Sequence, residues 1–236
     1  MRLIVLAAGT GKRMGDIQKG MIDAGDGKPL LHHSVMNAKP FIDAATIVTG
    51  RYHCSYEAAM KETGVEYELL RNHVWAVAGN AISVHLALST MHKYEPYILS
   101  NSDVITSRDA LEALVDTAKI QGEACGVVPG ETYVREGYAG IACVYSDSAR
   151  QRVKERVDEL LKAGAKDRYK LEHSCGHWDV FFRPPTEGAM PTFPEAQRLE
   201  ILPGHRIEID TYEDLAAYYL ARLKGEYEAL FRRWKG

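Results

Sequence analysis

Short apolar stretches alternate with longer segments of helical period through the first half of the chain. The apolar stretches predict strands, and the segments between them, where apolar residues recur every three or four positions, predict helices. We expect strands over 2–6, 44–49, 66–70 and 97–100, and helices over 30–38, 56–62, 81–92 and 107–120. This alternation favours a mostly parallel sheet covered by helices on both faces.

The second half is less regular but returns to the same pattern near its end. We expect strands over 125–128, 140–145 and 207–209, and helices over 147–163 and 212–223. Gly164 is a plausible stop for the helix that precedes it. The segment 173–198 has four prolines and little periodicity, so we expect it to wrap the active face rather than form a second domain.

The carboxyl-terminal tail, 225–234, has an amphipathic pattern. Its apolar residues fall on one helical face: Tyr227, Leu230, Phe231 and Trp234. Such a face packs either on its own domain or on a second subunit, so a homodimer is left open.

Composition and charge exclude several classes of partner. Of the 236 residues, 46% are apolar and 26% are charged, with 29 Lys and Arg against 32 Asp and Glu. So balanced a charge does not favour binding to nucleic acid or to an anionic membrane. No apolar run is long enough for a bilayer, and we expect a cytoplasmic protein.

The cysteines form no zinc or redox motif. They stand at 54, 125, 143 and 175, and no two make a CxxC pair. His173, Cys175 and His177 alternate, so in a strand they would share a face and could hold a metal. Because no fourth ligand is evident, we favour a polar strand or loop near a substrate pocket.

A small-residue loop follows the first predicted strand. Its sequence is Leu6-Ala7-Ala8-Gly9-Thr10-Gly11-Lys12-Arg13-Met14. The glycines let backbone amides approach a phosphate chain, and the basic residues place positive charge beside it. Because the loop matches neither the Walker A motif nor the dinucleotide-binding motif, its spacing alone is weak evidence.

The longer pattern is more specific. The loop, Lys19 and the later segment Gly27-Lys28-Pro29-Leu30-Leu31 together resemble the opening signature of nucleotidyltransferases. The resemblance implies a single α/β domain of GT-A-like, Rossmann-like fold, with a mixed, mostly parallel sheet flanked by helices. It divides 1–236 into a nucleotide-binding half (1–105), an acceptor- and metal-binding half (106–224) and a helical tail (225–236). It implies that Arg13 and Lys19 are the catalytic residues, with Arg13 binding the triphosphate and Lys19 contacting its phosphates. The nucleotide-binding residues that it implies in the loop are Leu6, Ala7, Ala8, Gly9 and Gly11.

Carboxylates stand at two positions where this family binds magnesium. Asp103 ends a predicted strand, where the family has its first ligand, and Glu208 and Asp210 lie two apart near the carboxyl end. Residues two apart in a strand face the same side, so both carboxylates could meet one Mg²⁺ ion. Alternatively, Asp210 or Thr211 caps the next helix, with Thr211 and Asp214 as a capping box. The two interpretations are compatible.

Shorter features resemble the phosphocholine cytidylyltransferases and their phosphonate-using relatives. These features are the Glu208-Ile209-Asp210 segment and the helix start at Asn80 and Ser83, which in those enzymes lie beside the nucleotide. Asn80 is also a good N-cap, and Ser83 could be merely polar. Trp178-Asp179 falls where those enzymes have an acidic and aromatic segment facing the acceptor.

The resemblance implies transfer of CMP from CTP to a small phosphate- or phosphonate-bearing acceptor, with Mg²⁺ and release of pyrophosphate. One alternative is a sugar-1-phosphate nucleotidyltransferase. Another is a nucleotide-binding regulatory module without turnover. The acceptor and the preferred base stay open at this point.

Overall fold

A seven-stranded sheet forms the centre of the molecule. The computed structural model describes residues 1–76, 80–92, 94–127, 138–166, 198–202 and 204–231. The strands are β1 (Arg2–Ala7), β2 (Ala44–Thr49), β3 (Glu66–Arg71), β4 (Tyr97–Asn101), β6 (Glu123–Val127), β7 (Tyr138–Val144) and β8 (Arg198–Glu200), in the order β3-β2-β1-β4-β7-β6-β8. Only the pairings of β7 with β4 and β6 are antiparallel, so the predicted mixed, mostly parallel sheet is confirmed.

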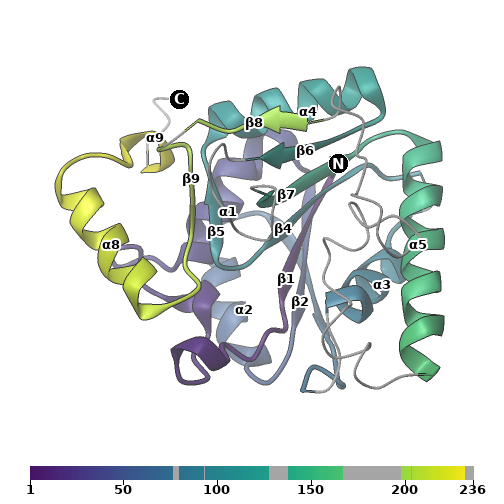
Figure 1. Ribbon diagram of the computed structural model, residues 1–236, viewed down its shortest axis with the longest axis horizontal. Helices are drawn as coiled ribbons and strands as arrows, with labels where there is room; N and C mark the ends of the chain where they lie inside the picture. The colour runs from purple at the N-terminus through teal and green to yellow at the C-terminus, as the bar shows by residue number, and fades with distance from the viewer. Residues whose placement is uncertain (77–79, 93, 128–137, 167–197, 203, 232–236) are drawn as a thin grey trace, which may run out of the picture.

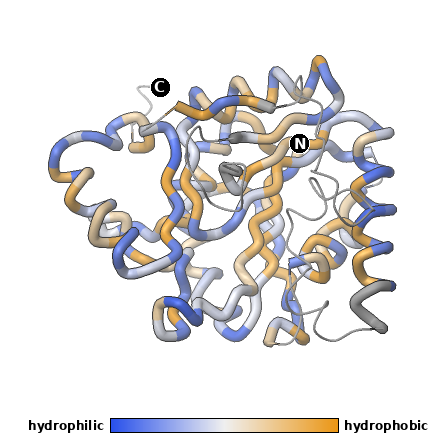
Figure 2. Tube along the Cα trace, viewed as in Figure 1, coloured by the Kyte–Doolittle hydropathy of each residue, from blue (hydrophilic) through white to orange (hydrophobic). Residues whose placement is uncertain are grey.

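Helices cover both faces of this sheet (Figure 1). One face packs against α1 (Leu30–Ala38), α2 (His53–Lys61) and α4 (Arg108–Gln121), and the other against α3 (Asn80–Thr90) and α5 (Asp147–Lys166). In β1, Leu3 and Val5 face the first layer and Ile4 and Leu6 face the second. Because both faces are covered, the central strands are apolar along their length, as Figure 2 shows for β1 and β2.

A smaller unit packs beside the sheet and contains the carboxyl-terminal elements. The strand β5 (Val104–Thr106) pairs antiparallel with β9 (Arg206–Glu208), followed by α8 (Tyr212–Leu223) and α9 (Glu228–Phe231). Leu230 is fully buried, and the ring centroids of Phe231 and His33 lie 4.8 Å apart in an edge-to-face arrangement. The described part of the tail therefore packs on its own domain. Short 3-10 helices are η1 (Lys12–Met14), η2 (Lys19–Met21) and η3 (Lys39–Phe41).

Most predicted elements are present, with several differences. The helix predicted from 56 begins at His53, and β5 and β8 have no predicted counterparts because three residues carry no periodicity. The helix α5 continues past Gly164 to Lys166, so the predicted stop is wrong. A single interior glycine costs only about 1 kcal/mol, which flanking alanines can offset.

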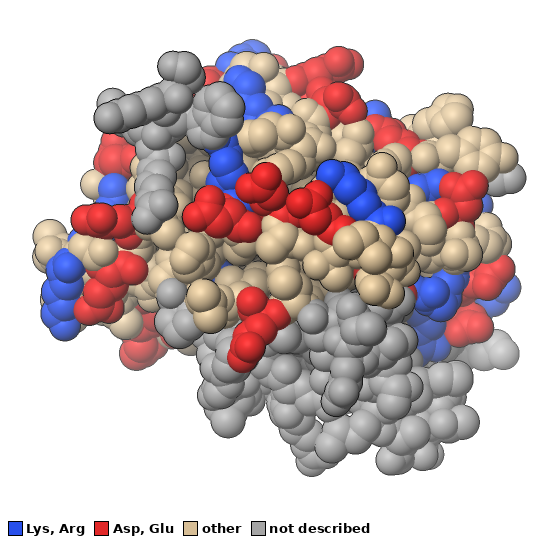
Figure 3. Space-filling model, turned by 90° about the horizontal axis from the view of Figure 1, so that it is seen from above, with Lys and Arg blue, Asp and Glu red and all other residues tan. Residues whose placement is uncertain are grey.

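Several expectations fall outside the described residues. These are the wrapping segment up to residue 197, the trio His173, Cys175 and His177, the pair Trp178 and Asp179, and the tail beyond residue 231. Among the described helices, none combines the length and the hydrophobicity that a membrane span requires. On the face shown in Figure 3, acidic and basic side chains are interspersed.

Candidate active site

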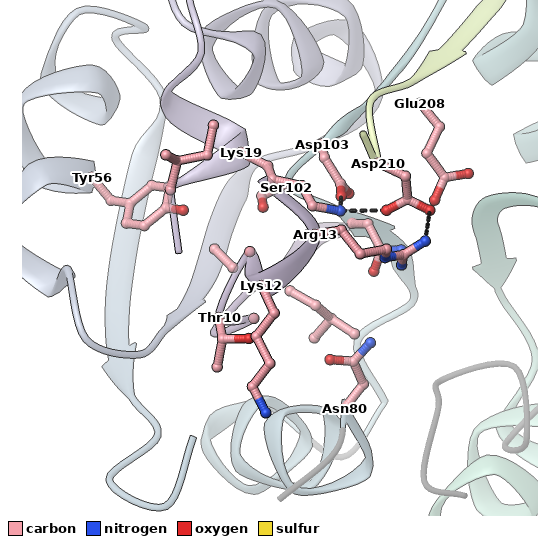
Figure 4. A pocket seen from close by; sticks show the side chains of 16 residues that line it. Thr10, Lys12, Arg13, Lys19, Tyr56, Asn80, Ser102, Asp103, Glu208 and Asp210 are labelled. Carbon is pink, nitrogen blue, oxygen red and sulfur yellow. Dashed lines mark hydrogen bonds and ion pairs between the residues drawn. The ribbon is translucent and has the colours of Figure 1, made fainter. Parts of the chain in front are cut away.

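A cavity of about 440 Å³ opens at the carboxyl ends of β1 and β4. In open α/β sheets, ligands bind at this edge. Residues from both ends of the chain meet here, as Figure 4 shows. The described lining is Leu6, Ala7, Gly9, Thr10, Gly11, Lys12, Arg13, Ile17, Lys19, Tyr56, Asn80, Asn101, Ser102, Asp103, Glu208 and Asp210.

The glycine loop turns tightly below this cavity. Gly11 has φ 66°, and its carbonyl accepts hydrogen bonds from the amides of Met14 (2.8 Å) and Asp16 (3.1 Å). A Cβ on Gly11 would lie 2.1 Å from the carbonyl oxygen of Ile17, so the turn requires glycine there. Gly9 differs, because a Cβ built on it meets no atom within 4 Å. The protein itself does not require glycine at position 9, whereas a ligand approaching the backbone would.

Two basic side chains form ion pairs with carboxylates that line the cavity. The Nζ atom of Lys19 lies 2.8 Å from Oδ2 of Asp103 and also donates to Oδ1 of Asp210. Arg13 Nη1 lies 3.1 Å from Oδ2 of Asp210. Burial alone would lower the pKa of Lys19, but the two carboxylates outweigh it and the pKa is raised. Lys19 therefore stays positively charged at neutral pH.

The pairing of β5 with β9 brings the three carboxylates together. Val104 pairs with Glu208, and the amide of Ile209 donates to the carbonyl of Asp103 at 3.2 Å. One carboxylate oxygen from each of Asp103, Glu208 and Asp210 lies within 4.8 Å of the others. Oxygen donors so grouped fit a hard divalent cation such as Mg²⁺.

Glu208 has a different environment from the other two carboxylates. Burial raises its pKa to about 7, although Arg206, two residues earlier on the same strand, contacts its carboxylate and lowers it. The carboxyls of Asp103 and Asp210 add to the rise. A divalent cation would favour the ionised form of all three groups.

The capping box predicted for Thr211 and Asp214 is confirmed. Thr211 accepts from the amide of Asp214 at 3.1 Å, and the Asp214 carboxylate accepts from the amide of Thr211 at 2.8 Å. The same carboxylate accepts from the backbone amide of Asp210 at 3.0 Å. The cap therefore uses Thr211 and Asp214, and the side chain of Asp210 faces the cavity.

Comparison with known proteins agrees with this geometry. Residues 3–175 match the model of the MobA-like NTP transferase domain. The chain belongs to this family. A bifunctional IPC transferase and DIPP synthase from Archaeoglobus fulgidus is 29% identical over 115 residues, or 49% of this chain and 23% of the relative. The bifunctional protein GlmU of Burkholderia multivorans is 27% identical over 121 residues, or 50% of this chain and 26% of GlmU. The matches thus span about a quarter of the length of these curated relatives.

Solved structures share the fold of this MobA-like domain. The inositol-1-phosphate CTP transferase from T. maritima has a TM-score of 0.65 at 19% identity and covers 94% of both chains. The CTP:phosphocholine cytidylyltransferase LicC from Streptococcus pneumoniae has a TM-score of 0.67 at 16% identity, over 94% of this chain and 98% of its own. A UDP-glucose pyrophosphorylase has a TM-score of 0.67 at 15% identity, over 95% of this chain and 98% of its own. The predicted nucleotidyltransferase fold is confirmed.

The structure of the MobA-like domain does not bring every predicted residue to the cavity. Asn80 lines it from the start of α3, but Ser83 is buried and its Oγ accepts from Asn72 Nδ2 at 3.2 Å. Ala8 is not among the lining residues, although its neighbours Ala7 and Gly9 are. Ser83 and Ala8 are therefore placed beside the cavity wall rather than in it.

Other lining residues were not predicted. Tyr56 reaches the cavity from α2, and its pKa is raised by burial although Ser102 hydrogen bonds to it. Asn101 ends β4 and Ser102 follows it, directly before Asp103. Thr10 precedes Gly11 in the loop, and the carbonyl oxygen of Ile17 lies against Gly11. The position of Asp103 could have indicated Asn101 and Ser102, whereas Tyr56 required the packing of α2.

Proposed function

We propose that this chain transfers CMP from CTP to a small phosphate- or phosphonate-bearing acceptor and releases pyrophosphate. The observation that carries the proposal is a single cavity that joins the glycine loop, Arg13 and Lys19 to a trio of carboxylates. A triphosphate, a divalent cation and a second anion could all be held there. The nucleotide would occupy the side of Gly9 and Asn80.

The reaction needs positioning more than a side-chain nucleophile. An oxygen of the acceptor attacks the α-phosphorus in line and forms a new P–O bond, while the bond to the β-phosphate oxygen breaks and pyrophosphate leaves. Mg²⁺ held by Asp103, Glu208 and Asp210 would supply charge neutralisation and alignment of the phosphates. Arg13 and Lys19 reduce the repulsion between the two anions and orient the triphosphate.

Two structural relatives support CTP and a phosphate-bearing acceptor. One is an inositol-1-phosphate CTP transferase and the other a CTP:phosphocholine cytidylyltransferase, and each acceptor carries a phosphate. The separate acceptor- and metal-binding half proposed from the sequence would bind such a molecule. Because Asp103 precedes residue 106, the proposed metal site uses residues from both halves.

A sugar-1-phosphate nucleotidyltransferase is the second candidate. The observation that favours it is the structural match to a UDP-glucose pyrophosphorylase in complex with UDP-glucose. That enzyme differs from the proposed one in the base and the acceptor, whereas transfer at the α-phosphorus is common to both. The catalytic carboxylates would therefore be the same.

A substrate grid with a matched pair of variants tests the proposal. Pyrophosphate release would be measured with Mg²⁺ for CTP, UTP, dTTP and GTP against phosphocholine, inositol-1-phosphate, aminoethylphosphonate and hexose-1-phosphates. We expect turnover with CTP and a small phosphate or phosphonate, and a 10²- to 10³-fold lower kcat/KM in Asp103→Asn, by order of magnitude. Asp116→Asn is the control, because Asp116 is exposed on α4 and pairs with Lys119. Preference for another nucleotide with a hexose phosphate would favour the second candidate, and silence with nucleotide still bound would favour a regulatory module or an acceptor outside the grid.

A further inference from the structure

Lys19 lies between two of the three carboxylates that the proposed metal requires. Its ammonium nitrogen contacts Oδ2 of Asp103 and Oδ1 of Asp210 at the same time, and Figure 4 shows it bridging them. A cation ligated by Asp103 and Asp210 would draw on the same two carboxylates. An ammonium group and a divalent cation cannot occupy one position between two carboxylates.

The formal charges of the basic and acidic side chains around the proposed metal site cancel. Lys19 and Arg13 offset the charges of Asp103 and Asp210, and Arg206 contacts Glu208. With the charges already paired, a divalent cation that arrives alone gains little Coulomb energy and must displace Lys19. When a cation binds together with a triphosphate, the charge balance of the site is different, because phosphate oxygens can replace the carboxylates as partners of Lys19 and Arg13.

The basic residues differ in how readily they could change partners. The side chain of Arg206 is 4% exposed, whereas that of Lys19 is 14% exposed and that of Arg13 is 54% exposed. Lys19 and Arg13 also line the cavity, where a triphosphate would lie. Arg206 is not in the described lining, so it would stay on Glu208 while the other two move.

We propose that Lys19 is the counter-ion of Asp103 and Asp210 in the nucleotide-free protein and competes with the divalent cation for them. The triphosphate draws Lys19 and Arg13 to its oxygens and thereby frees the carboxylates, so that metal and nucleotide bind with positive cooperativity. This inference rests on the proposed function, because it assigns the triphosphate to this cavity. Lys19 thus has two roles: it is the counter-ion of the carboxylates before the nucleotide binds, and it contacts the phosphates afterwards.

The test is the affinity of the nucleotide-free protein for Mn²⁺, measured by electron paramagnetic resonance. We expect Lys19→Gln to bind Mn²⁺ at least about tenfold more tightly than wild type, because one competing charge is removed. Lys19→Arg, which keeps the charge, should bind as weakly as wild type. Lys12→Gln is the matched control, because Lys12 lines the same cavity but points away from the carboxylates in Figure 4. Equal or weaker Mn²⁺ binding by Lys19→Gln would overturn the inference.

A measurement on wild type keeps the inference testable if Lys19→Gln does not fold. In protein with ¹⁵N-labelled lysine, Mg²⁺ alone at millimolar concentration should leave the Lys19 ammonium resonance unchanged, and Mg²⁺ with a non-hydrolysable CTP analogue should shift it. A full shift with Mg²⁺ alone would show that the metal displaces Lys19 without nucleotide, and it would contradict the proposed cooperativity. Failure of the counter-ion role is distinguishable from failure of the proposed function. If the wild type catalyses transfer but Lys19→Gln does not bind Mn²⁺ more tightly, only the counter-ion role is rejected. If Lys19→Gln binds Mn²⁺ more tightly but the wild type catalyses no transfer, only the proposed function is rejected.

Discussion

Gly9 and Gly11 stand two residues apart in one loop, yet the structure gives them different reasons to be glycine. Gly11 has a left-handed backbone, and a Cβ there would lie 2.1 Å from a backbone oxygen of Ile17. Gly9 does not have a positive φ, and its Cβ would project into open space. Substituting alanine at each position therefore separates what the fold requires from what a ligand requires.

The two variants should change different quantities. A left-handed backbone at a non-glycine residue costs about 1–2 kcal/mol. With the displacement that the contact forces on the loop, Gly11→Ala should lower the free energy of unfolding by about 2–4 kcal/mol. Gly9→Ala should change it by less than about 1 kcal/mol, in either direction. However, its methyl group would push the phosphates away by about 1 Å, which should reduce kcat/KM about 10²-fold.

Urea unfolding and steady-state pyrophosphate release measure these two effects on the same preparations. The expected result is a stable but poorly active Gly9→Ala and a destabilised Gly11→Ala. Wild-type kcat/KM in Gly9→Ala would refute the assignment of Gly9 to the triphosphate. Wild-type stability in Gly11→Ala would refute the requirement for glycine in the turn.

Two further predictions concern the carboxyl-terminal part of the site. The pKa of Glu208 is about 7 in the folded protein, above the ordinary value of 4.5, so the folded state holds a proton that the unfolded state has lost between these values. In metal-free buffer, the free energy of unfolding should therefore fall by up to about 3 kcal/mol as the pH rises from 4.5 to 7. Glu208→Gln should lack this loss of stability. Parallel pH profiles of stability for the wild type and the variant would contradict the raised pKa of Glu208. Thr211→Ala removes the cap of α8 and should lower the free energy of unfolding by about 1 kcal/mol, whereas Thr211→Ser should not. Thermal unfolding measures both capping variants, and equal stability would argue against the cap.

The sheet could be predicted from the sequence because its strands are apolar along their length. In β2, Ala45 to Thr49 are all buried, and the predicted bounds of this strand agree with the structure. The short strands β5 and β8 were not predicted, because three residues carry too little pattern to distinguish a strand from a loop. The end of α5 was missed because a glycine signals a stop only where the following residues do not continue the helix.

Part of the candidate site could be predicted from the sequence, and part could not. Asp103, Glu208 and Asp210 were found because each stands in a recognisable motif, and the structure brings them together through the β5–β9 pair. The sequence could not show that Lys19 lies between two of them, because the contact joins residues far apart in the chain. Nor could it place Tyr56 at the cavity, which depends on how α2 packs.

The proposed function requires transfer at the α-phosphorus of a nucleoside triphosphate bound in this cavity. The most direct measurement follows the two ends of the triphosphate separately, with CTP labelled by ³²P at the α or the γ position, Mg²⁺ and the acceptor that the grid selects. We expect the α label to move into the acceptor product and the γ label into pyrophosphate, and Asp103→Asn to slow both equally. Release of the γ label as orthophosphate, with the α label left on CDP, would contradict the proposed function.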